Sequence, residues 1–600
     1  MDKIAVLDFG GQYAHLIASR IRRQGVYAEI KRPKTPAYLL KNYKGIILSG
    51  GPRSVFEKNS PRCDKRIFDL NIPILGICYG HHLMAFLQRG YVKPAPTKEF
   101  GPAELTINDN SHIFKDIDTK QTVWMSHGDS VTVVPRNFKV IASTKDCENA
   151  AIADEQMKFY GVQFHPEVTH TACGDQIFNN FLEICNAKRD WDLSEYLEKK
   201  IAYIKDYVRD RRVFMLISGG VDSTVSFAIL EKALGKERVY GLFVDTGFMR
   251  YQEKEQVEKA LKEIGVENLH VYDAKKEFYS SLKNVYDPEI KRAVIGNLFL
   301  EIKDKVSKDL RLNIDEWMLG QGTIYPDTIE SGGTQYSSRI KTHHNRVEGI
   351  QELIKRKRII EPVKELYKDE VRQIGEKLGL PKELVWRQPF PGPGLAVRIL
   401  CAKKENYPPN HLALERQVNM LLAETDNLKG KVLPIKSVGV QGDNRTYRHP
   451  LVIYGDTTWD ELKNISTKLI NQFKEINRVV YGFGISNIEN VQLSLSELAE
   501  DRIKLLQKAD KIVQDAIFEK DLTKDIWQFP VVLLPVNFNN QGKESIVLRP
   551  VESMDAMSAG VYELDWMTVK KIADDLLIIP DISAVLYDVT SKPPATIEWE

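Results

Sequence analysis

Short apolar runs recur along the first part of the chain, each followed by glycine or polar residues. Three of them are KIAVLDFG at 3–10, KGIILSGG at 44–51 and IPILGICYG at 72–80. Continuous runs of this kind are typical of strands buried on both faces of a parallel sheet. We therefore expect residues 1–190 to form one α/β domain.

A helical pattern marks the passage to a second domain at 191–398. The stretch DLSEYLEKKIAYIKDYVRDRR, from Asp192, keeps apolar residues at helical spacing, and Asp192 and Glu195 are placed as a capping box. Strand-like runs then restart at VFMLISGG and RVYGLFVDTG, which predicts a second parallel sheet. The second domain is expected to end near three prolines, at positions 389, 391 and 393, which rule out a regular helix there.

The last part, 399–600, carries one pattern twice. Each half predicts strand, strand, helix and strand, with 22 residues from Trp459 to Tyr481 and 21 from Trp566 to Tyr587. The fold class is thus α/β, with two parallel-sheet domains followed by an α+β C-terminal domain. We expect that domain to be an internal duplication; a chance likeness of two common α+β patterns is the alternative.

Charge and cysteine content narrow the class of protein. Lys and Arg total 84 against 82 for Asp and Glu, so no net field favours nucleic acid or an anionic membrane surface. Six cysteines without a C-x-x-C pair argue against a disulfide framework or a structural zinc site. The N-terminus shows no apolar signal region, and no run is long enough to span a bilayer. We expect a cytoplasmic, cytosolic protein whose partners are small molecules.

A G-x-C-x-G sequence follows the third apolar run and predicts a sharp strand-to-helix turn. Gly76 and Gly80 flank Cys78, and the dipole of the following helix favours a thiolate. YGVQFHPE supplies His165 as a base with Glu167 to orient it. The glycines of LSGGP, which end with Gly51, offer backbone N–H groups to an oxyanion.

The sequence leaves two other interpretations of Cys78. A lone buried cysteine is usually a small hydrophobic residue of the core. A zinc site with His81 and His82 lacks a second ligand pair elsewhere in the sequence. Because the turn, the His-Pro-Glu sequence and the glycine turn occur together, we favour the nucleophile.

GICYG and FHPE, together with LDFGGQY, SGGP and WMSHGD, resemble the class I glutamine amidotransferases. The resemblance implies that Cys78 attacks the carboxamide of glutamine and releases ammonia, with Gly51 and Tyr79 at the oxyanion. His82 stands where the family normally has a glutamine that helps to hold the substrate, which predicts an altered contact rather than a dead site. Gly11 replaces the usual serine.

VFMLISGGVDSTVSFAIL predicts a strand, a glycine-rich loop and a helix that cradle an anion. No G-K-[ST] follows, so this is not a Walker A loop, and no lysine of the motif reaches the phosphates. We expect the loop to hold a departing pyrophosphate, with Asp222 serving Mg²⁺ that accompanies ATP. A bare Ser-Gly-Gly turn is the alternative.

SGGVDST and FVDTG resemble the pyrophosphatase loop and second strand of the N-type ATP pyrophosphatases. That family adenylates a substrate oxygen and releases pyrophosphate. The residues expected to bind ATP are Ser218, Gly219, Gly220, Val221, Asp222, Ser223, Thr224, Val244 and Asp245.

LGQGTIYPDTIES, RIKTHHN, RQPFPGPGLAVRIL, GVQGDNRTY, VLRPVES and SKPPATIEWE together resemble the glutamine-hydrolysing GMP synthetase family. There ATP adenylates O2 of XMP, and ammonia replaces it to give GMP, so ATP, XMP and glutamine are the expected partners, without an organic prosthetic group. Lys341 would be catalytic in a lid that also carries His343 and His344, near Asp327 and Glu330. This segment lacks the glycine pair that the family usually has after HHN. The alternative to a lid is an ordinary solvated loop. The residues expected to bind XMP are Arg292, Asp443, Gln528, Lys592, Ile597 and Glu598.

The length of the C-terminal part bears on assembly. In the common bacterial pattern of this family, one α+β module per chain pairs with another chain to make a dimer. A chain with both modules needs no such partner, so we expect a monomer, with a homodimer as the alternative. Two rival functions are an ATP-dependent RNA-modifying enzyme with the same loop and a catalytically silent nucleotide-sensing scaffold.

Overall fold

The structure, a computed structural model, describes residues 1–11, 13–109, 111–168, 170–312, 315–327, 353, 356–423, 428–441, 444–523, 525–553 and 559–600. It divides into two compact units, Met1–Glu195 and Tyr196–Glu600, and each is described by itself. The second unit contains both the second and the third predicted domain. The predicted limits at residues 190 and 398 stay predictions.

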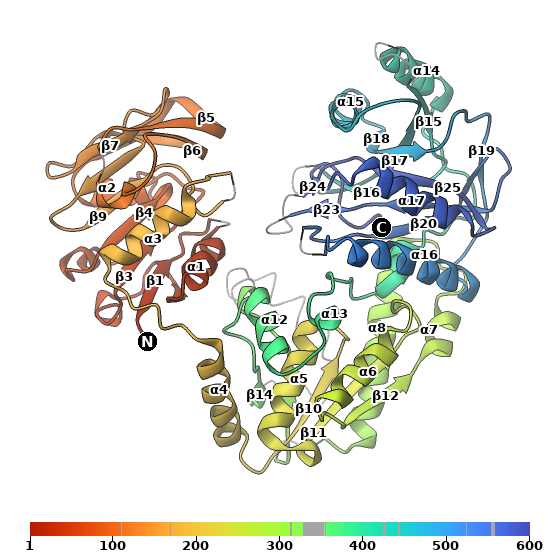
Figure 1. Cartoon of the computed structure of the whole chain (residues 1–600), viewed down its shortest axis with the longest axis horizontal. Coiled ribbons are helices and arrows are strands. Elements are labelled where there is room, and N and C mark those ends of the chain that lie inside the picture. Colours follow the sequence, from red (N-terminus) through yellow and green to blue (C-terminus); the bar gives the residue numbers. More distant parts are fainter. Residues whose placement is uncertain are drawn as a thin grey trace. The chain divides into compact units, whose positions relative to one another are not determined.

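The first unit is built on a sheet of nine strands (Figure 1). The three strands predicted from apolar runs are present as β1, β3 and β4, and they pair in parallel with each other. From β9 onward, however, the neighbours β8, β7, β5 and β6 pair antiparallel, so the sheet is rich in parallel strands but not wholly parallel. In sheet order the strands are β2 (Tyr27–Lys31), β1 (Lys3–Leu7), β3 (Gly45–Leu48), β4 (Ile74–Ile77), β9 (Phe159–Val162), β8 (Ala151–Asp154), β7 (Lys139–Ser143), β5 (Tyr91–Ile107) and β6 (Lys120–Val133).

Helices follow the parallel strands of this unit. The most important is α2, because it starts directly after β4 and directs its N-terminus at Cys78. The longer helices are α1 (Ala14–Arg23), α2 (Tyr79–Leu87) and α3 (Gly174–Ile184), and short 3-10 turns lie at Ala37–Leu39, Lys65–Asp69 and His112–Phe114.

The predicted linker helix is α4, Leu193–Val208. Asp192 caps it, since its side chain accepts a hydrogen bond from the Glu195 N–H at 2.8 Å. Four of its apolar side chains at helical spacing are buried: Leu193, Leu197, Ile204 and Val208.

The second unit begins with a five-stranded sheet in which every pairing is parallel, as predicted. The chain leaves β10 towards β11 on one side and later returns to β13 on the other, so the end of β10 is a topological switch point, where α/β sheets bind ligands. The order is β12 (Leu269–Asp273), β11 (Val239–Asp245), β10 (Arg212–Ile217), β13 (Trp317–Gly320) and β14 (Ile359–Ile360). Its helices are α5 (Val221–Leu234), α6 (Glu253–Glu263), α7 (Lys275–Ser281), α8 (Pro288–Asp309), α12 (Lys368–Lys377) and α13 (Lys382–Val385), with 3-10 turns η4 (Lys236–Arg238) and η5 (Gly394–Arg398).

The C-terminal part forms a seven-stranded sheet. Counted inward from either edge of its six-strand path, the strands follow the same sequence of antiparallel and parallel pairings. On one side β17 is parallel to β18 and antiparallel to β15; on the other, β22 is parallel to β25 and antiparallel to β20. The path is β15 (Lys429–Val432), β17 (Asn444–Tyr454), β18 (Ile476–Phe483), β25 (Ile582–Asp588), β22 (Glu544–Leu548) and β20 (Val531–Leu534), with β16 (Ser437–Gln441) paired to β17. Smaller pairs join β19 (Val491–Leu493) to β21 (Val536–Phe538) and β23 (Val551–Glu552) to β24 (Gly560–Val561).

The centre of this sheet joins the two halves. Strands β18 and β25 run antiparallel with Tyr481 opposite Tyr587. The helices α15 (Trp459–Gln472) and α17 (Trp566–Leu577) each begin at the predicted tryptophan, and Trp459 and Trp566 stack with ring centroids 4.6 Å apart. The described residues of this part also form helices α14 (His411–Leu422) and α16 (Glu500–Glu519).

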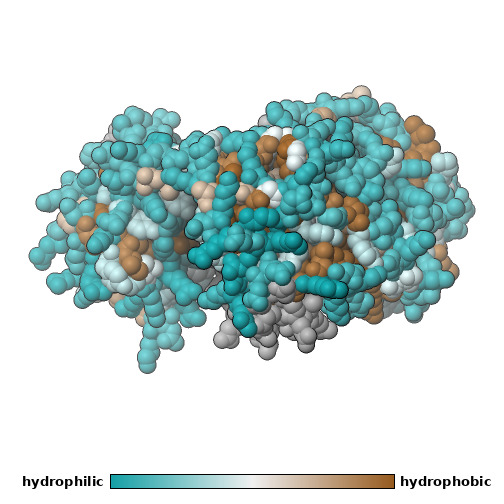
Figure 2. Space-filling view, turned by 90° about the horizontal axis from the view of Figure 1, so that it is seen from below, coloured by the Kyte–Doolittle hydropathy of each residue, from teal (hydrophilic) through white to brown (hydrophobic). Residues whose placement is uncertain are grey.

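One apolar cluster spans both large sheets of the second unit. It reaches from Phe214 in β10 to Tyr587 in β25, so the parallel sheet and the C-terminal sheet share packing. None of the helices among the described residues is both long and apolar enough to cross a membrane. The face drawn in Figure 2 is largely hydrophilic, with small separate hydrophobic patches.

Candidate active sites

Cys78 occupies the turn between β4 and α2. Its φ of 51° and ψ of −106° lie outside the regions that non-glycine residues favour. The neighbouring glycines allow this turn: a Cβ on Gly76 would stand 2.6 Å from the Gly80 carbonyl oxygen, and one on Gly80 would stand 2.1 Å from the Leu48 carbonyl oxygen. The backbone therefore presents the sulfur at the N-terminus of α2, as the sequence predicts.

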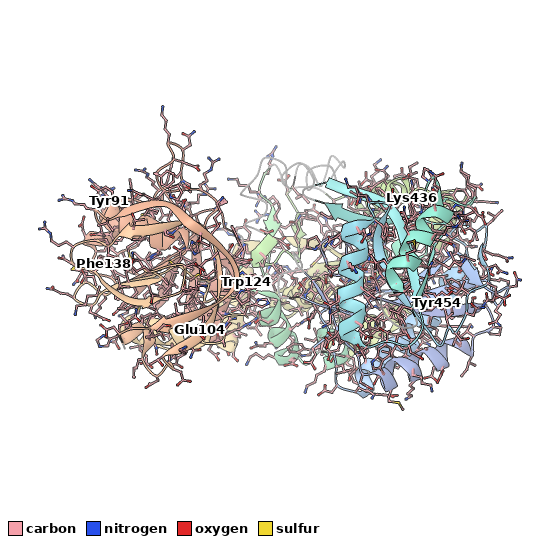
Figure 3. The ribbon with its side chains drawn as sticks, turned by 90° about the horizontal axis from the view of Figure 1, so that it is seen from above. Tyr91, Glu104, Trp124, Phe138, Lys436 and Tyr454 are labelled. Atoms are coloured by element: carbon pink, nitrogen blue, oxygen red, sulfur yellow. The ribbon has the colours of Figure 1, made fainter. Side chains whose placement is uncertain are left out.

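His165 and Glu167 form a buried pair. Nδ1 of His165 lies 2.6 Å from Oε1 of Glu167, and neither side chain is exposed to more than a few per cent. The backbone N–H of His165 donates to the carbonyl of Trp124, a β6 residue marked in Figure 3. Burial lowers the pKa of His165, but Glu167 and Cys78 raise it, and the net pKa lies well above its ordinary value. The imidazolium is thus the favoured form.

The glycine turn after β3 completes the first site. A Cβ on Gly50 would stand 3.2 Å from Cε1 of His165 and 3.7 Å from Cβ of Cys78, and one on Gly51 would stand 3.2 Å from the ring of Tyr79. All the residues predicted for glutamine hydrolysis in the first unit therefore lie together: Cys78, His165, Glu167, Gly51 and Tyr79.

His82 lies on the buried side of α2. Its Nε2 is 2.6 Å from Oε1 of Gln163, and burial lowers its pKa to about 4, so the imidazole is neutral at ordinary pH. A zinc site formed by Cys78 with His81 and His82 is one of the alternatives that the sequence leaves open. Among the residues that the structure describes, the one group of His, Cys and acidic side chains close enough to hold a metal is a different one, Glu99, His127 and Cys147.

The glycine-rich loop lies at the end of β10, at the switch point of the second sheet. Gly219 has a φ of 78°, which only glycine adopts without strain, and Gly220 caps α5. The Ser218 and Ser223 hydroxyl oxygens are 3.1 Å apart, and the Thr224 hydroxyl donates to the Gly220 carbonyl at 2.9 Å. The N–H groups at the start of α5 follow this turn, which is the arrangement expected of an anion cradle.

A lysine that the sequence analysis missed reaches this loop. Lys368, the first residue of α12, places Nζ 2.5 Å from Oδ2 of Asp222, although the two are 146 residues apart in the chain. A cation at a helix N-terminus opposes the helix dipole, so LYKDEVR carried a local signal of a functional constraint. Oδ1 of Asp222 is buried without a hydrogen-bond partner among the described residues, which fits a cation ligand.

The second strand of the ATP motif holds Val244 and Asp245, both buried. Oδ1 of Asp245 accepts a hydrogen bond from the Gly247 N–H at 3.0 Å, and its Oδ2 lies 3.1 Å from Nζ of Lys275. Asp245 thus fixes the turn after β11, beside the loop end of the sheet.

The C-terminal segment is docked rather than frayed. Trp599 is fully buried, and its Nε1 donates to Asp588 at 3.0 Å. Glu598 accepts from Arg398 through both oxygens, at 3.1 and 2.9 Å, and Nε2 of Gln528 lies 3.4 Å from the same carboxylate.

The other residues predicted for XMP also approach this segment. Arg292 donates to the Glu600 carbonyl, and the Ile597 carbonyl accepts from Nε of Arg549 at 3.0 Å. Lys592 pairs through its backbone with Ala559.

Several of the predicted site residues belong to segments outside the described part of the chain. Lys341, Asp443 and Glu330, with His343 and His344, lie outside the described residues. Asp327 is described, and its Oδ2 accepts from the Ile324 N–H at 3.2 Å.

The chain matches three protein families. Residues 5–185 match "Glutamine amidotransferase class-I", residues 196–327 match "NAD synthase", and residues 515–599 match "GMP synthase C terminal domain". These ranges cover most of the first unit, four of the five strands of the parallel sheet and the second half of the C-terminal sheet.

Whole-length relatives extend this likeness. A protein of Leptospira interrogans described as "Probable GMP synthase (glutamine-hydrolyzing)" is 49% identical, over 100% of this chain and 99% of its own. A Dictyostelium discoideum protein described as "GMP synthase (glutamine-hydrolyzing)" is 37% identical, over 99% of this chain and 94% of its own. A Clostridium botulinum protein of the same description is 44% identical, over 96% of its length but 80% of this chain.

Proposed function

The chain belongs to the family of glutamine-hydrolysing GMP synthases, and from this premise we propose that it converts XMP to GMP with ATP and with ammonia taken from glutamine. The observation that carries the proposal is the 49% identity to a glutamine-hydrolysing GMP synthase over the entire chain. The products are GMP, AMP, pyrophosphate and glutamate. The substrates are therefore three small molecules: ATP, XMP and glutamine.

Glutamine hydrolysis falls to the first unit. The Cys78 thiolate attacks the carboxamide carbon of glutamine, and the charge that develops on oxygen meets the backbone N–H groups of Gly51 and Tyr79. The C–N bond breaks as the His165 imidazolium gives its proton to the leaving ammonia. Water, deprotonated by His165, then hydrolyses the glutamyl thioester, and Glu167 holds the ring in orientation throughout.

The synthetase reaction falls to the second unit. The loop from Ser218 to Thr224 binds the β- and γ-phosphates, which leave as pyrophosphate when XMP O2 attacks the α-phosphorus. Ammonia then adds at C2, and the C–O bond to AMP breaks. We assign Mg²⁺ to Asp222, whose free oxygen suits a hard cation; bound there, the ion would neutralise phosphate charge. Lys368 supplies a cation that the motif itself lacks.

XMP is assigned to the docked C-terminal segment. Arg292 and Lys592 supply positive charge for its phosphate, and Gln528, Ile597 and Glu598 offer polar groups to the purine. Asp443 and Lys341 keep the roles that the resemblance implies, the second as the lid lysine near the α-phosphate.

A paired assay tests the assignment. Cys78→Ala should abolish glutamine-driven GMP formation and keep the activity with added ammonium, whereas Asp222→Ala should abolish both. Cys63→Ala, which removes another thiol of the same unit, is the matched control and should leave both activities intact. Full use of glutamine by Cys78→Ala would refute the first assignment, and GMP formation by Asp222→Ala would refute the second.

We further propose that the C-terminal sheet is an internal duplication and that the chain is a monomer. The sheet order from either edge, the Tyr481 and Tyr587 pair and the stacked tryptophans support two copies of one module. The Clostridium relative aligns with only 80% of this chain, so about a fifth of the chain has no counterpart there. Sedimentation equilibrium at micromolar protein should give the mass of one chain, 68.6 kDa. A stable dimer would refute the monomer.

We place the enzyme in the cytosol. All six cysteines are free thiols, which a reducing compartment preserves. Recovery of the protein from a membrane or an oxidising compartment after cell fractionation would contradict this.

A further inference from the structure

A group of charged side chains lies between the ATP loop and Glu598, and no role was predicted for any of them from the sequence, although two of them belong to RQPFPGPGLAVRIL. We call it the charge relay, and it consists of Arg250, Glu253, Arg387, Arg398 and Asp510. Glu253, Arg398 and Asp510 are buried, and the two other side chains are 13% exposed. Buried charges need partners, so their connections show what this group holds together.

One end of the relay touches the ATP loop. NH1 of Arg387 donates to Oε1 of Glu253 at 2.8 Å, while its NH2 lies 3.6 Å from where a Cβ on Gly219 would stand and has no partner among the described residues. The other oxygen of Glu253 accepts from the Arg250 backbone N–H at 3.0 Å. Glu253 thus connects Arg387, which lies beside the ATP loop, to the backbone at Arg250.

The other end holds the carboxylate assigned to XMP. The guanidinium of Arg398 meets both oxygens of Glu598, a geometry that fixes the plane of the carboxylate and that lysine cannot reproduce. Arg398 is a positioning residue in this sense, because it acts on the substrate through Glu598.

Asp510, on α16, stands between the two ends. Its Oδ2 is 3.6 Å from Nε of Arg250, which is too long for a hydrogen bond. Burial raises the pKa of Asp510, while the positive charges of Arg250 and Arg398 act to lower it. The guanidinium groups of Arg250 and Arg398 lie 4.7 and 5.2 Å from the ring of Phe390, so one aromatic side chain contacts both.

The middle of the relay has unused hydrogen-bonding capacity. Among the described residues, Oδ1 of Asp510, Nε and NH2 of Arg250 and NH1 of Arg398 are buried without a partner. Unfilled donors and acceptors in a buried network cost free energy, and a small shift that pairs them is favourable. A phosphate bound in the loop would offer an acceptor to NH2 of Arg387, and a movement of that side chain would be transmitted through Glu253 and Arg250 to Asp510.

We propose that Asp510 is a positioning residue that couples nucleotide binding at the ATP loop to the orientation of Glu598, so that ATP strengthens the binding of XMP through the charge relay. The proposal rests on the proposed function, since it takes Glu598 to contact XMP. By reciprocity, XMP strengthens the binding of ATP by the same factor.

The test measures binding without turnover. XMP is titrated calorimetrically into the full-length enzyme with Mg²⁺, with and without an ATP analogue carrying an α,β-methylene bridge. We expect the analogue to lower the Kd of XMP about tenfold in the wild type, within the usual range of coupling. Asp510→Asn should reduce that factor to below about twofold while the Kd for XMP alone changes less than about threefold. Arg250→Gln breaks the same step from the other side and should act alike.

A matched control separates coupling from general damage. Glu544 is another buried carboxylate that pairs with an arginine of α16, Arg502, at 2.5 Å, so Glu544→Gln should lower thermal stability and keep the tenfold factor. Arg398→Lys should weaken XMP binding with and without the analogue.

The outcomes are separable. Coupling that survives in both Asp510→Asn and Arg250→Gln, a wild type that binds both nucleotides independently, or an equal loss in Glu544→Gln would overturn the relay. A wild type that does not bind XMP would overturn the proposed function itself.

Discussion

Glu167→Gln is the substitution that most directly tests the first site. It keeps the size of the side chain and one oxygen near Nδ1 of His165, but removes the charge that lies 2.6 Å from the ring. Because both side chains are buried, solvent cannot replace that charge. The neutral amide therefore stabilises the imidazolium less than the carboxylate does.

The upper limit of the effect follows from replacing a charged hydrogen-bond acceptor by a neutral one. A hydrogen bond to a charged group is worth about 1.5–3 kcal/mol, which corresponds to a loss of about 10-fold to about 150-fold in the rate of glutamine hydrolysis. The sign of the pH effect follows from the pKa of His165, which Glu167 raises above 6.5. The protonated form is favoured below that raised pKa and lost as the pH rises through it, so the variant should lose activity at lower pH than the wild type.

The assay compares glutamine-driven and ammonium-driven GMP formation from pH 6 to pH 10. Only the glutamine-driven rate should fall, and its alkaline limb should move to lower pH. An unchanged rate, or a limb that moves to higher pH, would refute the role of Glu167 as the charge that holds the imidazolium. An equal fall of the ammonium rate would show that the variant had damaged more than the first site.

Three further changes test other parts of the structure. His82→Gln restores the amide that the amidotransferase family normally has, so the KM for glutamine should fall severalfold at constant kcat; a higher KM in a glutamine titration would contradict this. Gly80→Ala places a Cβ 2.1 Å from the Leu48 carbonyl oxygen, so glutamine use should be lost while ammonium use remains; a fully active variant would show that the turn has room. Asp588→Asn removes the counter-charge of Arg478 and of a second buried arginine, so the free energy of unfolding in urea should fall by about 3–5 kcal/mol; a change below about 1 kcal/mol would be against this.

The strands that the sequence predicts are those with a continuous apolar run. β3 and β4 are buried along their whole length, and their sequences are apolar throughout. The antiparallel strands β5 and β6 were missed. In β6 buried and more exposed positions roughly alternate, and polar residues such as Ser126 and Asp129 interrupt it, so its composition resembles a loop. Such a strand is recognised only with its partner, because pairing decides which face is covered.

In the candidate sites, too, features set by neighbouring residues could be predicted, whereas contacts between distant residues could not. The turn at Cys78 depends on two glycines within two residues of it, so its geometry could be predicted locally. Lys368 meets Asp222 across 146 residues, and no spacing in the sequence joins them. The fork of Arg398 on Glu598 spans 200 residues and was equally out of reach. Predictions from sequence therefore located the two glycine-containing turns and the position of Cys78 in the first of them. Contacts between distant segments of the chain could be identified only in the folded structure.

The pairing of Tyr481 with Tyr587 at the centre of the C-terminal sheet has a genetic consequence. In an assembly of two identical chains, a single codon change alters both sides of a symmetric contact at once. Here the two sides are encoded separately, so either tyrosine can change while the other stays. The two strands can therefore change independently, and a loss on one side can be compensated by a second change on the other.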